Sequence, residues 1–210
     1  MTNRRIALTA LGCALALSGY MAAPIARAQG ASGSPVKLLS SRISLAGTSN
    51  IHAYTAASTA ARIVRLQVAS GAPNANVLEA LLTPGVVEAF EISIPAATLS
   101  SAKDGIDKNM HKALKAAEHP DITFRLSRME EPDASGAIRG VGTLRIAGVE
   151  REVVLALKTR RTDAQLTVTG EVQLLMTDFG ITPPKAMLGM LKTDPKVTVT
   201  FETVLGVPVT

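Results

Sequence analysis

The sequence contains no tryptophan, only four phenylalanines and two tyrosines, and a single cysteine among its 210 residues. A lone cysteine excludes a small disulfide-linked scaffold, because it has no partner within the chain. Charged residues make up 19% of the sequence and hydrophobic residues 47%, which excludes an intrinsically disordered chain. The length suits a globular domain with a substantial apolar core.

The excess of positive charge is small and comes largely from the N-terminus. The chain has a formal net charge of +5, and removal of Arg4, Arg5 and Arg27 leaves 19 cationic against 17 acidic residues, a net of +2. A nearly neutral domain with few aromatic residues lacks the electrostatic footprint of a DNA- or RNA-binding protein. Nucleic acid is therefore not an expected partner.

The first 28 residues have the features of a secretory signal peptide. Two arginines within residues 1–5 precede an uncharged apolar run at 6–26, and Ala26-Arg27-Ala28 supplies the small residues that a signal peptidase accepts. We predict cleavage after Ala28, so that residues 1–28 form the signal peptide and residues 29–210 the exported domain. No stable membrane span is expected after cleavage.

An uncleaved membrane anchor is the alternative reading of this segment, because a run of 21 residues is long enough to cross a bilayer. Gly12, Gly19 and Pro24 interrupt the run and argue against a stable spanning helix. The single cysteine, Cys13, lies inside the same segment. The mature domain is therefore expected to have no thiol chemistry and to need no oxidant to fold.

Beyond about residue 34, apolar residues recur at every second position, which is the period of a half-buried β-strand. The pattern predicts eight strands, at about 36–47, 60–70, 90–94, 120–130, 137–147, 150–160, 164–176 and 197–202. Short turns between residues 120 and 176 predict an antiparallel meander. One apolar and one polar face per strand predict an all-β domain built as a closed barrel or a sandwich.

Two segments interrupt the strand pattern and predict short helices. Residues 107–118 are good helix formers with an apolar face, and Pro120 follows them. Pro183-Pro184 is expected to open a second helix that carries Met187, Leu188 and Leu191. Neither helix is long enough to form a domain, so a single domain is predicted after the signal peptide.

The sequence offers little catalytic or metal-binding chemistry. The three histidines are His52, His111 and His119, and their spacing matches no zinc site, so no metal or cofactor is expected. Ser49 and His52 are close in sequence, but there is no G-x-S-x-G elbow and no evident acidic partner. A non-catalytic protein is therefore predicted, and a weak hydrolase or isomerase that uses Ser49, His52 or His119 remains the less favoured alternative.

Six segments, taken in order, resemble one known family. They are Gly47–His52, Phe90–Pro95, Met110–Lys115, Glu118–Phe124, Gly140–Arg151 and Met176–Ile181. This order resembles the YceI-like family of exported bacterial proteins. The resemblance implies an eight-stranded, antiparallel, lipocalin-like β-barrel with one or two short helices, located in the periplasm. It also implies an isoprenoid or fatty-acyl-type lipid as the ligand.

Because one slim ligand fits inside an eight-stranded barrel, the inward apolar side chains are the candidate ligand contacts. The candidates are Phe90, Ile92, Phe124, Leu126, Leu166, Val168, Val199 and Phe201. His52, Tyr54, Met110 and Met187 are candidate contacts at the mouth of the barrel or on its helices. Periodicity alone does not determine which face of each strand points inward.

One further alternative is a barrel filled by its own side chains, which would bind a protein partner or act in a stress response without lipid. The pattern leaves the head group of the ligand and the oligomeric state open, a dimer included.

Overall fold

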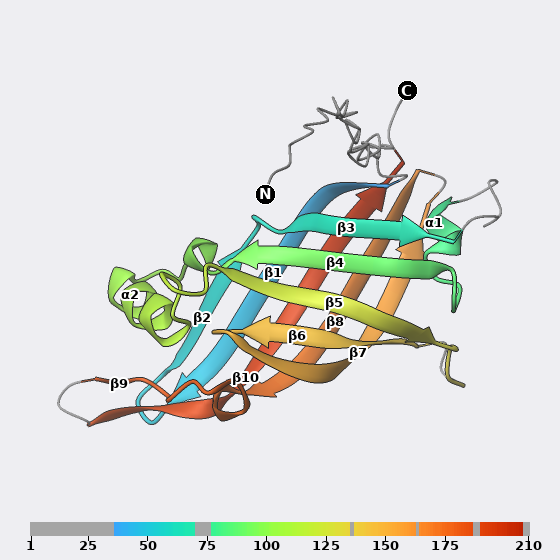
Figure 1. Ribbon diagram of the computed structural model, residues 1–210. Helices are drawn as coiled ribbons and strands as arrows, with labels where there is room; N and C mark the ends of the chain where they lie inside the picture. Colours follow the sequence, from blue (N-terminus) through green and yellow to red (C-terminus); the bar gives the residue numbers. More distant parts are fainter. Residues whose placement is uncertain (1–35, 70–76, 135–136, 163, 187–189, 208–210) are drawn as a thin grey trace, which may run out of the picture. The chain divides into compact units, whose positions relative to one another are not determined.

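The alternating segments form one antiparallel β-sheet that curls into a half-barrel (Figure 1). The computed structural model describes residues 36–69, 77–134, 137–162, 164–186 and 190–207. All of them belong to one compact unit, Gly33–Thr210. The predicted signal peptide lies outside the described residues.

The sheet has ten strands, connected mostly by short turns. The strands are β1 (Lys37–Ser49), β2 (Ala53–Ser58), β3 (Arg62–Val68), β4 (Val87–Pro95), β5 (Asp121–Glu130), β6 (Ile138–Ile146), β7 (Val149–Arg161), β8 (Gln165–Leu175), β9 (Lys185–Ala186) and β10 (Leu191–Gly206). The described residues also form two α-helices, α1 (Val77–Ala80) and α2 (Asp104–Ala113), and two 3₁₀ turns, η1 (Ala96–Thr98) and η2 (Met176–Phe179).

Hydrogen bonding links nine strands in the order β2-β1-β10-β8-β7-β6-β5-β4-β3, and β9 pairs with β10 outside this path. Every pairing is antiparallel, and β5 to β8 form the predicted meander. The path ends at β2 and β3. At the β2 edge, the segment after η1 adds one bridge: Ala57 of β2 and Ser100 exchange two main-chain hydrogen bonds of 2.8 and 3.0 Å.

The all-β, antiparallel architecture is confirmed, but the expected number of eight strands is too small. β2 was missed because its sequence, Ala-Tyr-Thr-Ala-Ala-Ser, consists mostly of small residues and gives a weak alternation of hydrophobicity. β9 has only two residues and is defined by its pairing with β10, which no local pattern encodes.

Of the two predicted helices, the first is present but begins and ends earlier in the chain than expected, and the prediction of the second is wrong. α2 begins three residues before the predicted start and ends at Ala113, and a turn with Lys115 at a φ of 51° follows it. Where the second helix was expected, Lys185 pairs with Lys192 and Ala186 with Leu191 in an antiparallel ladder. The long strand β10 supplies these hydrogen-bond partners, which outweigh the preference of a proline pair for a helix start. Met187 and Leu188 lie outside the described residues.

Two apolar clusters occupy opposite ends of the curled sheet. Near α1, Leu78 and Leu81 are buried together with Val36, Leu166 and Leu205. The second cluster lies at the end that carries α2 and η2. Its buried members are Ala96, Leu99, Leu114, Ala147, Leu174, Phe179, Ile181 and Val197. α1 and α2 thus lie at opposite ends of the strands (Figure 1).

Glycines on the inner face of the sheet make room for aromatic rings. Gly170 pairs with Phe201 across β8 and β10, and a Cβ at Gly170 would overlap that ring and lie 2.9 Å from the main-chain oxygen of Ala156. Gly142 of β6 likewise leaves space for the ring of Phe124, whose Cζ would be 2.6 Å from an added Cβ. Each ring therefore lies against bare backbone instead of extending further into the interior.

This packing predicts opposite effects for two glycine-to-alanine substitutions. Gly170→Ala forces the ring of Phe201 to move and should lower the free energy of unfolding by about 1–3 kcal/mol. Gly105→Ala in α2 is the control, because an added Cβ there meets nothing within 4 Å; it should raise stability by up to about 1 kcal/mol. Urea denaturation followed by circular dichroism measures both, and equal midpoints for the two variants would contradict the ring-over-glycine packing.

Candidate functional site

The curled sheet encloses one large apolar cavity of about 720 Å³. Residues of every strand except β3 line it, together with residues of α2, η2 and the turn after α1. Its volume lies within the range of about 300–1,000 Å³ that is typical of small-molecule sites. The inner face of the sheet is therefore not filled by its own side chains.

The structure determines which face of each strand points inward. Phe90 and Ile92 of β4 line the cavity, whereas Glu91 between them does not. All eight predicted lining residues lie on the cavity wall, namely Phe90, Ile92, Phe124, Leu126, Leu166, Val168, Val199 and Phe201. They come from β4, β5, β8 and β10, so segments far apart in sequence meet around one space. That these side chains contact a ligand stays a prediction.

Other wall residues were missed by the sequence reasoning. β7 contributes Val153, Leu155 and Leu157, and the turn after α1 contributes Leu81 and Leu82. The β7 residues are spaced by two, but Val154 and Ala156 between them are also apolar, so the sequence gives little contrast between the two faces of this strand. The leucines near α1 carry no such signal, because their place depends on how a short helix packs against the end of the sheet.

Polar side chains gather at the end of the cavity nearest α2 and the β9–β10 hairpin. Those that line the cavity here are Ser49, His52, Tyr54, Lys103, Asn109, Lys185 and Thr193. The remaining polar lining residue, Thr203, lies nearer the other end, where its hydroxyl is 3.4 Å from that of Ser41. The described lining residues include two lysines and no carboxylate. We call this polar end the mouth.

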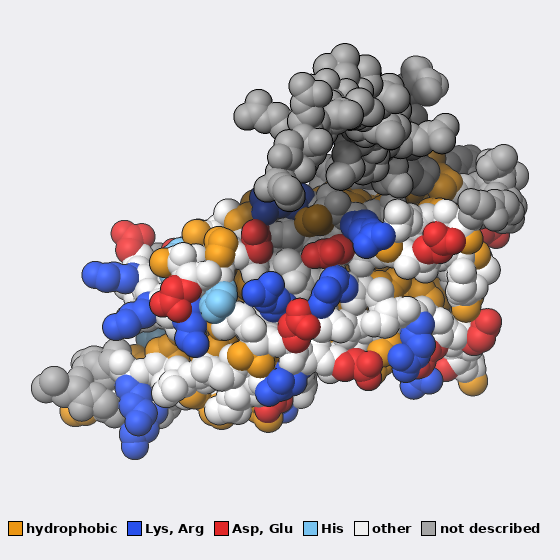
Figure 2. All heavy atoms as spheres, viewed as in Figure 1, with side chains coloured by type: hydrophobic (Ala, Val, Ile, Leu, Met, Phe, Trp, Pro, Cys, Tyr) orange, Lys and Arg blue, Asp and Glu red, His pale blue; other side chains and the backbone are white. Residues whose placement is uncertain are grey.

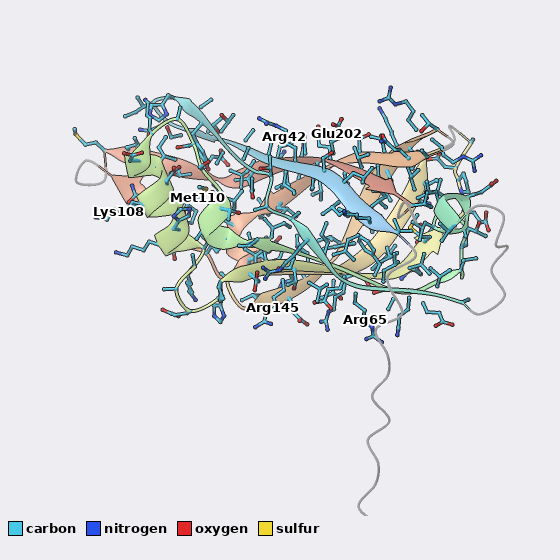
Figure 3. The ribbon with its side chains drawn as sticks, turned by 90° about the horizontal axis from the view of Figure 1, so that it is seen from above. Arg42, Arg65, Lys108, Met110, Arg145 and Glu202 are labelled. Atoms are coloured by element: carbon cyan, nitrogen blue, oxygen red, sulfur yellow. The ribbon has the colours of Figure 1, made fainter. Side chains whose placement is uncertain are left out.

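Three of the four residues predicted at the mouth or on its helices do line the cavity. His52 and Tyr54 belong to the β1–β2 turn and β2, and Met110 belongs to α2 (Figure 3). Met187 lies outside the described residues. α2 is held over this end in part by His111, whose Nε2 lies 2.7 Å from the main-chain oxygen of Leu99.

The hydroxyl of Ser49 has a structural role in the β1–β2 turn. Its Oγ donates a hydrogen bond of 2.8 Å to the main-chain oxygen of His52 and accepts one of 3.1 Å from the His52 amide. The serine thus bonds to the main chain of His52 rather than to its imidazole ring. This arrangement fixes the turn and differs from a nucleophile–base pair, in which the ring nitrogen accepts the hydroxyl proton.

The other two histidines contact backbone. The ring of His119 packs against Gly148, which has a φ of 83° in the β6–β7 turn and would bring an added Cβ into that ring. Within the described ranges, no group of three or more histidine, cysteine, aspartate or glutamate side chains could hold a metal ion.

The hydroxyl of Tyr54 is buried against Gly47, its cross-strand neighbour in β1. In the described part of the chain this oxygen has no hydrogen-bond partner. Burial, and to a lesser degree the negative charge of Asp194, raises the pKa of the Tyr54 phenol above its ordinary value of 10.0. A buried polar atom without a partner destabilises the fold, typically by about 1–3 kcal/mol.

Tyr54→Phe removes only this oxygen and should raise the free energy of unfolding by about 1 kcal/mol at neutral pH. Because the raised pKa means that the unfolded chain releases the phenol proton first, the wild type should lose further stability as the pH rises above 10, and the variant should lack this contribution. Urea titrations of both proteins at several pH values test it. A less stable variant would show that the hydroxyl has a partner.

A curled antiparallel sheet around an apolar cavity with a polar mouth defines a lipocalin-like class of β-protein. A model of the YceI-like domain family matches residues 42–205. The chain belongs to this family. No curated protein matches the sequence, and none of the helices in the described ranges is long and apolar enough to span a membrane.

Solved structures support the same fold. BcnA from Burkholderia cenocepacia is similar with a TM-score of 0.61 at 14% identity, over 78% of this chain and 95% of that chain. A polyisoprenoid-binding domain from Saccharophagus degradans, implicated in plant cell wall breakdown, is similar with a TM-score of 0.60 at 12% identity, over 84% of this chain and all (100%) of that domain.

Proposed function

We propose that the chain is an exported, non-catalytic binding protein that holds an isoprenoid or other lipid-like molecule inside its half-barrel. The observation that carries this proposal is the cavity of about 720 Å³, whose wall is apolar along most of its length and polar at one end. An amphiphile has the same division. Its hydrocarbon tail would lie between β4, β5, β8 and β10, and its head group would lie at the mouth.

Burial of the tail supplies enough free energy for useful affinity. Each buried CH₂ group contributes about 0.8 kcal/mol, so a tail with ten buried carbons gains roughly 8 kcal/mol before the cost of ordering it. No charged group has to be desolvated along the wall, because the two lysines that line the cavity belong to its mouth. The family membership and the polyisoprenoid-binding relative favour an isoprenoid tail.

Two alternatives have less support. A filled barrel that binds only a protein partner would not need an open apolar space of this size. A hydrolase or isomerase would need a reactive group at the mouth, where Ser49 is bonded to main-chain atoms of His52. His52→Ala distinguishes an enzyme from a carrier, since an enzyme that uses this ring loses turnover and a carrier keeps its ligand.

Two neighbouring valines of β7 provide a matched test of ligand binding. Val153 lines the cavity, and Val154 points outward with an exposed fraction of 51%. Val153→Glu places a charge on the cavity wall and should reduce the affinity for a fluorescent polyprenol at least about a hundredfold, because an unpaired charge in an apolar site is costly. Val154→Glu should leave the affinity unchanged.

Thermal unfolding of both variants separates lost binding from lost fold. If Val153→Glu does not fold, Val168→Trp replaces it, because this substitution fills cavity space with an apolar side chain and blocks the tail by size. A folded Val168→Trp protein that binds the polyprenol as tightly as the wild type would contradict the proposal.

Export provides an independent prediction. Expressed with its own first 28 residues in a Gram-negative host, the protein should appear in the periplasmic fraction with an intact mass that begins at Gln29. A mass that includes residues 1–28, found in the membrane fraction, would instead support the uncleaved anchor.

A further inference from the structure

We propose that the mouth end of the half-barrel docks on an anionic lipid bilayer, with Ile51 and Met190 entering the bilayer interface. This inference rests on the proposed function, because a water-insoluble ligand has to enter and leave the cavity through its mouth. Docking of the mouth on the bilayer would let the ligand pass between them without crossing bulk water.

The first observation is a pair of exposed apolar side chains at two adjoining turns. The exposed fraction is 57% for Ile51, in the β1–β2 turn, and 67% for Met190, just before β10. Asn50 ties the two turns together. Its Nδ2 donates a 2.9 Å hydrogen bond to the main-chain oxygen of Met190, and its Oδ1 accepts a 2.8 Å bond from the amide of Lys192.

These hydrogen bonds hold the two turns as one unit, so their apolar side chains can act together. We call Ile51 and Met190 the docking tips. Amphipathic protein surfaces bind anionic membranes when exposed apolar side chains, which enter the bilayer interface, lie beside cationic ones, which are attracted to the lipid head groups.

The second observation is the charge around the docking tips. Lys103 and Lys185 line the mouth, and Lys108 of α2 and Lys192 of β10 are exposed on the adjoining elements. Figure 2 shows cationic side chains over α2 and beside the hairpin at this end, and Figure 3 labels Lys108 on α2. Lysines close to an anionic bilayer are attracted to it within roughly a Debye length.

Acidic residues are also present at this end, on α2 and β10. Asp107 accepts a 2.7 Å hydrogen bond from the amide of Ser101, and Asp194 accepts a 2.8 Å bond from the amide of Lys196. Both carboxylates accept backbone donors and keep their negative charge, and Asp104 is exposed in the first turn of α2. Lys112 of α2 and Asp178 of η2 are also exposed at this end, so five lysines stand against four acids and the mouth end is weakly cationic.

The third observation is continuity with the cavity. The β1–β2 turn that carries Ile51 also carries Ser49 and His52, which line the mouth, and Thr193 lines it three residues after Met190. The docking tips therefore border the cavity opening. Val64 of β3 provides a contrast to the docking tips. Its side chain is similarly exposed, with an exposed fraction of 56%, but Val64 does not line the cavity.

The test is flotation of the mature protein, residues 29–210, with vesicles of phosphatidylglycerol and phosphatidylethanolamine, and separately with phosphatidylcholine vesicles. We expect binding to the anionic vesicles that weakens with added salt. Ile51→Asp and Met190→Asp together should reduce it by about tenfold or more, since each replaces an apolar anchor with a negative charge. Val64→Asp is the matched control and should bind as the wild type does.

Lys108→Gln with Lys192→Gln keeps the docking tips and should reduce binding to anionic vesicles several-fold, so the test stands even if the aspartate pair does not fold. Failure of the wild type to bind anionic vesicles would overturn the inference, as would equal binding by wild type and tip variants. A wild-type dimer that the Met190→Asp substitution dissociates, with no vesicle binding, would assign the tips to a second copy and also overturn it.

A polyprenol titration of the same proteins separates this inference from the proposed function. None of the four substituted positions at the mouth end lines the cavity, so all variants should keep the wild-type affinity for the ligand. A wild type that binds the polyprenol but no vesicles overturns membrane docking alone. A wild type that floats with vesicles but binds no polyprenol overturns the lipid-carrier function and leaves the docking surface in place.

Discussion

The structure depends on one constraint. The antiparallel sheet curls so that apolar side chains on opposite parts of its inner face point toward one another, but they do not fill the space between them. Antiparallel strands tolerate water on one side, so the polar residues of each strand can face solvent while the apolar ones face inward. The two apolar clusters, around Leu78 and around Phe179, pack the ends of the strands. The middle is left as a cavity, and its apolar wall is the basis of the proposed function.

Small residues keep this cavity open. Gly142 and Gly170 let the rings of Phe124 and Phe201 lie against backbone, and Gly47 does the same for Tyr54 at the mouth. With few aromatic residues in the chain, three of them are placed over glycines on the cavity wall. The low aromatic content thus also limits how much of the interior the protein can fill with its own side chains.

Periodicity predicted most strands of the fold and grouped residues that share a face, because side chains alternate across a strand. The eight proposed wall residues all line the cavity, but only the folded sheet shows which face points inward and adds the wall residues of β7. Periodicity failed where structure depends on distant partners: β9 exists through its pairing with β10, and β2 has too little apolar contrast to stand out. The mouth was only partly predicted. Lys103 and Asn109 come from α2 and its N-cap and Lys185 from β9, and only the folded chain places them with His52 around one cavity.

The central claim is that the cavity holds a lipid-like molecule, and native mass spectrometry of the exported, purified protein tests it most directly. The account predicts a mass above that of the chain alone, lost on denaturation and recovered as an apolar molecule in organic solvent. A protein that shows only its own mass, both as purified and after incubation with a membrane lipid extract, would contradict the account and favour a barrel that acts without lipid.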